Sequence, residues 1–137
     1  NAPVELDGRH DYDGGVGDSI PVGRALAKGY GKVVVVLTRR AGVYPRVGTK
    51  AQAAYRVFFR HYPQFRDALL SRPDRYRAQV TLLNRLEAQG RAFLIRPLEP
   101  ELPHLEKNPE LAASYYRHGY TRMAALWPEL QAFLNGK

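Results

Sequence analysis

Three carboxylates and three glycines lie close together near the start of the chain, in the stretch Asp11-Tyr-Asp-Gly-Gly-Val-Gly-Asp-Ser-Ile-Pro-Val22. A carboxylate can accept a proton from a neighbouring hydroxyl group, and its basicity rises when the site around it is partly dehydrated. Glycines have no side chain and let the backbone come close to another group. Asp13, which precedes Gly14 and Gly15, is therefore the residue of this stretch that is best placed for chemistry.

Simpler roles compete for the same residues. Asp18 or Ser19 can cap a following helix, and Asp11 can be a solvated strand residue. Asp13 itself can serve only to stabilise its turn. The tripeptide Asp-Gly-Gly alone does not decide between these roles and a catalytic one.

Metal binding by this acidic stretch finds little support. The alignment of an EF-hand loop that fits Asp13-Gly14 puts Arg9 at its first position and Ile20 at its last, where a carboxylate is required. The chain has no cysteine, and its histidines are too far apart to form a spaced ligand motif: His10, His61, His104 and His118. We predict no metal site and no cofactor.

Two short elements are predicted to position Asp13. The residues before it contain an Asp7-Gly8 pair between short apolar and polar alternations, which is typical of a two-residue hairpin loop. A short helix is predicted after the glycines, with Pro21 in its first turn and Asp18 or Ser19 at its N-cap. Asp13 is therefore expected between the end of a strand and the start of a helix.

The rest of the chain predicts an α/β fold. Four consecutive valines between Lys32 and Thr38 indicate a strand covered on both faces, as in a parallel sheet. Residues Arg91–Arg96 indicate a second apolar strand. Further helices are predicted over residues 50–62, 63–71, 73–89, 109–119 and 121–134, with Asn108 as the cap of the fourth. We expect a single region with a hairpin, at least two parallel strands, and more helices than strands.

The charge is concentrated in the middle of the chain. The net charge is +8, and the segment from Arg39 to Arg96 contains thirteen Lys and Arg residues but only three acidic residues. The helix predicted over residues 50–62 adds aromatic residues, so it is either core or an interfacial element that meets acyl chains and lipid headgroups. We expect a peripheral contact with anionic membrane as an alternative function, or contact with a protein partner, and no nucleic acid partner. A cytoplasmic location, with or without that membrane contact, fits this composition.

The order of these segments resembles the second half of bacterial patatin-like phospholipases. That family uses a Ser-Asp dyad, with the aspartate in an Asp-Gly-Gly or Asp-Gly-Ala turn, and Asp13 is the only position here that matches this motif. The segments Gly90-Arg-Ala-Phe-Leu-Ile-Arg-Pro97 and Tyr115-Tyr-Arg-His-Gly-Tyr120 also look like the family's C-terminal region. The resemblance implies a three-layer α/β/α fold and a lipid or acyl ester substrate. It also implies that Asp13 is the general base, Gly14 and Gly15 shape its turn, and Asp18 supports it.

The chain departs from that family's pattern in its serines. Ser19, Ser71 and Ser114 all lack the Gly-x-Ser-x-Gly context of the nucleophile, and no glycine-rich oxyanion loop is present. We therefore expect a C-terminal part of a hydrolase that carries half of the dyad and is inactive alone. Its exposed sheet edge is expected to be covered by the missing N-terminal half or by a second copy.

Overall fold

The structure is a computed structural model that describes residues 4–103 and 106–136, so His104 lies outside the described residues. The chain forms two compact units. The first contains Asn1–Lys28 and Tyr44–Leu82, and the second contains Gly29–Val43 and Leu83–Lys137. Each unit combines helices with a two-stranded sheet, so the fold is mixed α/β.

The first unit begins with the predicted hairpin. Strand β1 (Val4–Leu6) pairs antiparallel with strand β2 (Arg9–Asp11). Asp7 and Gly8 connect them with φ angles of 51° and 74°, the two positive values that a type I′ turn requires. The prediction from the Asp7-Gly8 pair is confirmed, and it places the end of β2 two residues before Asp13.

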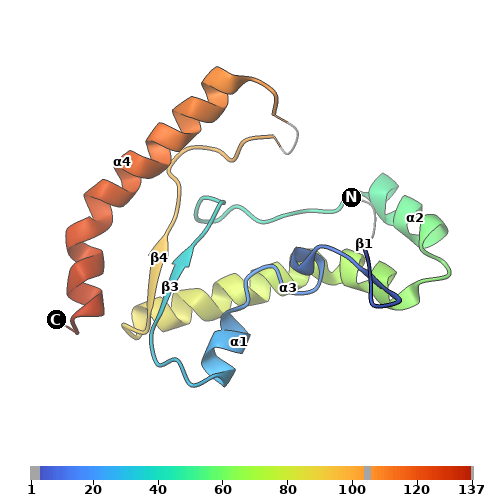
Figure 1. Cartoon of the computed structure of the whole chain (residues 1–137), viewed down its shortest axis with the longest axis horizontal. Coiled ribbons are helices and arrows are strands. Elements are labelled where there is room, and N and C mark those ends of the chain that lie inside the picture. The colour runs from blue at the N-terminus through green and yellow to red at the C-terminus, as the bar shows by residue number, and fades with distance from the viewer. Residues whose placement is uncertain (1–3, 104–105, 137) are drawn as a thin grey trace. The chain divides into compact units, whose positions relative to one another are not determined.

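A single 3-10 turn and a short helix follow the hairpin (Figure 1). The turn, η1, spans Gly14–Val16, and helix α1 spans Val22–Ala27. The predicted cap of this helix is wrong, because its N-cap is Pro21, which has no capping side chain. Asp18 and Ser19 make hydrogen bonds with other groups of the same unit, which leaves neither of them for the helix end.

Helix α3 (Pro63–Ala88) replaces the two helices that Pro73 was predicted to separate. Proline removes one backbone hydrogen bond from a helix interior and crowds the preceding turn. Here the side chain of Arg75 reaches back across Pro73 and donates to the Ala68 carbonyl oxygen and to Ser71 Oγ. These bonds join the two sides of Pro73 within one continuous helix.

An aromatic cluster joins the hairpin end of the first unit to its helices. The ring of Phe65 in α3 lies 4.1 Å from that of Tyr12 and 5.0 Å from that of Phe59, measured between centroids. Phe59 follows helix α2 (Thr49–Phe58), in which Tyr55 extends the cluster. The aromatic residues that were expected to share one helix face therefore have different environments. Tyr55 and Phe59 pack in the cluster, whereas Phe58 is exposed.

The second unit contains the predicted parallel strands, β3 (Val33–Val36) and β4 (Ala92–Ile95). Their pairing is extended at both ends, by the Val33 amide donating to the carbonyl oxygen of Arg91 and the Leu37 amide donating to that of Ile95. The expectation that β3 is covered on both faces is wrong for this chain. Val34 and Val36 are 40% and 72% exposed, so this face of β3 is not buried.

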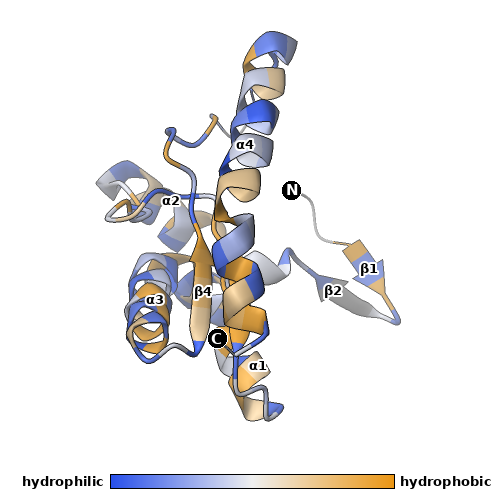
Figure 2. Ribbon diagram, turned by 90° about the vertical axis from the view of Figure 1, so that its left-hand side faces the viewer, coloured by the Kyte–Doolittle hydropathy of each residue, from blue (hydrophilic) through white to orange (hydrophobic). Residues whose placement is uncertain are grey.

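Helix α4 (Pro109–Leu134) runs beside β4 in the second unit (Figure 2). Asn108 is its N-cap, as predicted, and accepts from the amides of Glu110 and Leu111. The predicted break after Gly119 is wrong, because interior glycine costs only about 1 kcal/mol and the helix is bonded to the sheet region on both sides of it. Pro128 is also accommodated, since the carbonyl it leaves unpaired belongs to the exposed Ala124.

Each unit has its own small core. The buried apolar residues of the first unit are Ile20, Val22, Tyr76 and Val80, and those of the second are Leu37, Leu83, Leu86, Ala92, Leu94, Ile95, Leu126 and Leu130. Phe133 near the end of α4 adds a ring contact to Phe93 of β4, at 5.6 Å between centroids. Among the described residues, none of the helices combines the length and apolar character needed to cross a membrane.

Candidate functional site

Asp13 sits at the turn between β2 and η1, in the first unit. It is the N-cap of η1, and its Oδ1 accepts a hydrogen bond from the Gly15 amide at 2.8 Å. The backbone carbonyl of Asp13 accepts from the Val16 amide at 3.0 Å, which closes the turn. The carboxylate is exposed, and its Oδ2 has no hydrogen bond to any described residue. One oxygen therefore fixes the group while the other stays accessible.

Gly15 is the residue that lets this carboxylate lie against the backbone. A Cβ atom added at Gly15 would lie 3.2 Å from Asp13 Oδ1, closer than nine in ten real contacts of a Cβ atom. Gly14 has open space at the corresponding point, so its lack of a side chain is not required by packing within this chain. Of these two glycines, Gly15 is therefore the one at which a side chain would crowd the Asp13 carboxylate.

Arg75 of α3 holds the Asp13 turn in place. One terminal nitrogen of its guanidinium, Nη2, donates to the carbonyl oxygens of Val16 and Ala68 at 2.6 and 2.7 Å, and the other, Nη1, donates to Ser71 Oγ. The first of these bonds joins η1 directly to the helix. Arg72 adds a weaker bond from Nε to Ser19 Oγ at 3.4 Å. The position of the turn is therefore set by α3.

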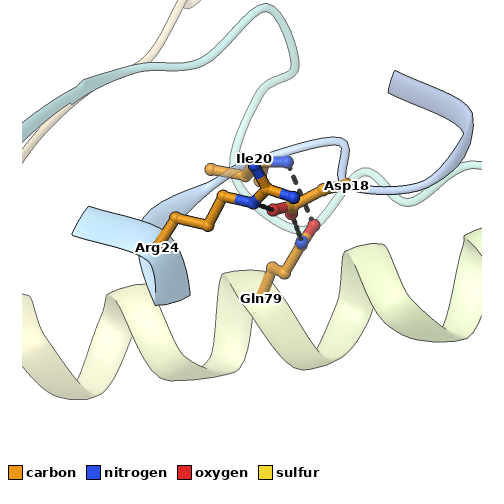
Figure 3. A network of polar contacts seen from close by, with 4 residues as sticks. All are labelled: Asp18, Ile20, Arg24 and Gln79. Atoms are coloured by element: carbon orange, nitrogen blue, oxygen red, sulfur yellow. Dashed lines mark hydrogen bonds and ion pairs between the residues drawn. The ribbon is translucent and has the colours of Figure 1, made fainter. Parts of the chain in front are cut away.

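Gln79, one helical turn beyond Arg75, binds the segment between η1 and α1 (Figure 3). Its amide nitrogen donates to Asp18 Oδ1 at 2.5 Å, and its amide oxygen accepts from the Ile20 backbone amide at 3.2 Å. Asp18 Oδ2 also lies 4.0 Å from Arg24 Nε. Asp18 consequently ties the loop to α3 rather than capping α1.

The serines of the chain are placed in structural roles or away from Asp13. Ser19 Oγ donates to the Gly15 carbonyl at 2.8 Å, and Ser71 lies between Asp67 and Arg75. Ser114 belongs to the second unit. The described residues therefore bring no serine hydroxyl into hydrogen-bonding contact with Asp13.

The second unit contains two neighbouring cavities that the sequence did not reveal. The smaller has a volume of about 300 Å³ and lies where β3 and β4 end, against α4. The larger has a volume of about 540 Å³ and lies between α4 and the proline-rich segment before it. Tyr115 and His118 line both cavities, while Arg122 lines only the smaller. Neither cavity includes Asp13.

Sequence reasoning missed Arg75, Gln79 and Arg122. A signal for the first two existed, because Ser71, Arg75 and Gln79 are spaced four residues apart and must share one face of a helix. That signal required α3 to be continuous through Pro73, which the proline argued against. No comparable pattern in the sequence singles out Arg122.

One ion pair in the first unit shifts the ionisation of its partners. Arg66 Nε donates to Asp67 Oδ1 at 2.8 Å. This hydrogen bond lowers the pKa of the Asp67 carboxyl and raises the pKa of the Arg66 guanidinium. The pair is solvent-exposed on α3, so it carries little stability and is not part of the Asp13 turn.

Comparison with protein families finds a match for the C-terminal part of the chain. Residues 62–135 match a family described as a domain of unknown function, DUF6363. The match covers α3, β4 and α4 but neither the Asp13 turn nor β3. No curated protein and no solved structure shows significant similarity to the chain. Because the matched residues make up more than half of its length, the chain belongs to the DUF6363 family.

Proposed function

We propose that this chain supplies the catalytic aspartate of a patatin-like lipid acyl hydrolase whose serine nucleophile lies elsewhere in a longer parent protein. The observation that carries the proposal is the state of the Asp13 carboxylate. Its Oδ1 is fixed by the Gly15 amide, its Oδ2 is open, and the turn is held by Arg75. A general base needs this combination of a fixed position and an accessible lone pair.

The chemistry assigned to Asp13 is proton transfer during acyl transfer. Asp13 accepts the hydroxyl proton of the serine as its oxygen attacks the ester carbonyl carbon, and the alcohol leaves with a proton returned from Asp13. Water then attacks the acyl-serine and gives a proton to Asp13, which passes it to the leaving serine oxygen, so that the carboxylic acid is released and both Asp13 and the serine are regenerated. The parent must also supply an oxyanion hole, in which a single donor contributes about 3 kcal/mol.

The uncovered face of β3 supports a larger α/β sheet in the parent. Parallel sheets are almost always covered on both faces, and Val34 and Val36 expose apolar side chains on one side of β3. We include in the proposal that β3 and β4 belong to a three-layer α/β/α sandwich. The missing N-terminal half, or a second copy of the chain, covers this face.

The hydrolase proposal is tested by comparing the parent with this chain. We expect the full-length parent to hydrolyse p-nitrophenyl butyrate and a fluorophosphonate probe to label one serine, in a Gly-x-Ser-x-Gly sequence upstream of Asn1. This 137-residue chain should show neither reaction. A parent without esterase activity or probe labelling would remove the hydrolase function, and hydrolysis by the isolated chain would show that the nucleophile lies within it.

A second candidate function, membrane-surface binding, is favoured by exposed apolar side chains at the end of α2 and just after it, which are those of Val57, Phe58 and Tyr62. These side chains are 62%, 77% and 59% exposed. The exposed Arg56 and Arg60 alternate with them along the chain. Apolar side chains next to arginines suit the boundary between headgroups and acyl chains of an anionic bilayer.

We expect the chain to sediment with vesicles that contain phosphatidylglycerol and to bind less as salt rises. Phe58→Ser should weaken binding about tenfold, because a large apolar side chain no longer enters the bilayer. Tyr116→Ser is the matched control, since Tyr116 is 72% exposed but lies on α4, and it should leave binding unchanged. Absence of binding at every salt concentration, or equal effects of the two substitutions, rules the membrane function out.

A further inference from the structure

The smaller cavity of the second unit lies at the carboxyl ends of parallel strands, where ligands of α/β proteins commonly bind. Its walls come from the last residues of β3 and β4, the residues that follow them, and the middle of α4. The lining is mostly apolar, including Leu37, Ile95, Pro97 and Met123. A volume of about 300 Å³ is at the lower end of the range typical of small-molecule sites, about 300–1,000 Å³.

Arg122 places a guanidinium group in this apolar setting. The residue is half-buried, and its Nε donates to the carbonyl oxygen of Arg96 at 3.3 Å. Its two terminal nitrogens have no hydrogen-bond or ion-pair partner within residues 4–103 and 106–136, and no carboxylate lines the smaller cavity. A guanidinium beside apolar walls is stabilised by a planar anion that accepts two parallel hydrogen bonds.

Two other polar side chains of the cavity, those of His118 and Tyr115, are already engaged. His118 Nε2 accepts from the Leu98 amide at 3.1 Å. The Tyr115 hydroxyl donates to the Thr38 carbonyl oxygen at 3.3 Å. Neither residue carries a negative charge that would neutralise Arg122. Arg96 also lines the cavity, but its Nη2 donates to Asn84 Oδ1, outside the lining. Arg122 is thus the lining guanidinium whose terminal nitrogens have no partner among the described residues.

We propose that this cavity binds an unbranched apolar carboxylic acid, with the carboxylate on Arg122 and the chain against Leu37, Ile95 and Met123. A carboxylate matches the planar guanidinium of Arg122 in both charge and geometry. The modest volume favours a medium-length chain over a long one. The site lies wholly within the second unit, so the proposal stands whether or not the parent hydrolyses esters.

Met123 offers a direct readout, because it is the single methionine of the sequence and lines the cavity. With methyl-¹³C methionine in the 137-residue chain, we expect decanoate to move this resonance saturably. Decanol should bind at least tenfold more weakly, since it lacks the charge that Arg122 recognises. Decanol binding equal to decanoate, or no movement of the resonance with decanoate, overturns the site.

Variants and a second anion complete the test. Arg122→Gln should weaken decanoate binding at least tenfold, whereas Arg85→Gln should not, because Arg85 is exposed on α3 away from the cavity and carries the same charge. Equal effects of the two substitutions contradict the proposal. Decyl phosphate distinguishes a lipid phosphate from a fatty acid, and its tighter binding would overturn the assignment of a carboxylate. If Arg122→Gln does not fold, the comparison of decanoate with decanol on the unaltered chain decides the question.

Discussion

Asp13→Asn in the full-length parent is expected to lower kcat/KM for p-nitrophenyl butyrate by about 10²–10⁴-fold, the usual contribution of a general base. In the proposed mechanism, the substitution removes the negative charge that accepts the serine proton. It preserves the turn, because an asparagine Oδ1 can still accept the Gly15 amide and asparagine is as good an N-cap as aspartate. The measurement is steady-state kinetics, with thermal unfolding followed by circular dichroism to confirm an unchanged fold.

Asp11→Asn is the matched control for that experiment. Asp11 is two residues away, is exposed at the end of β2, and makes no side-chain bond to a described residue. The same change of charge near the turn should therefore alter kcat/KM by less than about twofold, as expected of surface charges screened by water. Equal losses in the two variants would mean that the charge of the loop matters and not Asp13, and full activity of Asp13→Asn would remove Asp13 from the mechanism.

Signals confined to a few neighbouring residues predicted the structure well. The Asp7-Gly8 pair gave the hairpin because a two-residue loop needs positive φ angles that few other residues adopt. Asn108 before Pro109 gave the start of α4 because both residues act on the first turn alone. In these cases the physical cause lies within the segment, so no knowledge of the rest of the chain is needed.

Signals that depend on distant residues failed. Pro73 predicts a helix start, but α3 continues through it, and the bonds from Arg75 to Ala68 and Ser71 cross it. The position of Asp18 predicts a cap of α1, but Gln79 lies 61 residues further along the chain and binds it instead. The sequence located Asp13 and its glycines, yet the residues that hold the turn could not be found without knowing which face of α3 meets it.

Arg75→Met is the second substitution with a large expected effect. It keeps much of the side-chain length but removes the hydrogen bonds to Val16, Ala68 and Ser71. We expect the free energy of unfolding of this chain to fall by about 2–3 kcal/mol, because charge-assisted bonds in a half-buried site are lost and two carbonyl groups lose a partner. Urea denaturation monitored by circular dichroism measures the change.

The same substitution separates the position of Asp13 from its charge. If Arg75 holds the turn where the serine needs it, Arg75→Met in the parent should lower kcat about tenfold to a hundredfold with Asp13 intact, since small misplacements of a catalytic group have effects of that size. Arg77→Met is the control, because Arg77 is exposed on the same helix, and among the described residues its side chain makes only a 3.7 Å ion pair with Asp74 and a contact with the Tyr44 ring. It should change stability by less than about 1 kcal/mol and leave kcat unchanged. A loss of stability without a loss of kcat in Arg75→Met would show that the turn does not depend on α3 for its catalytic position, and that Arg75 serves the continuity of the helix through Pro73 alone.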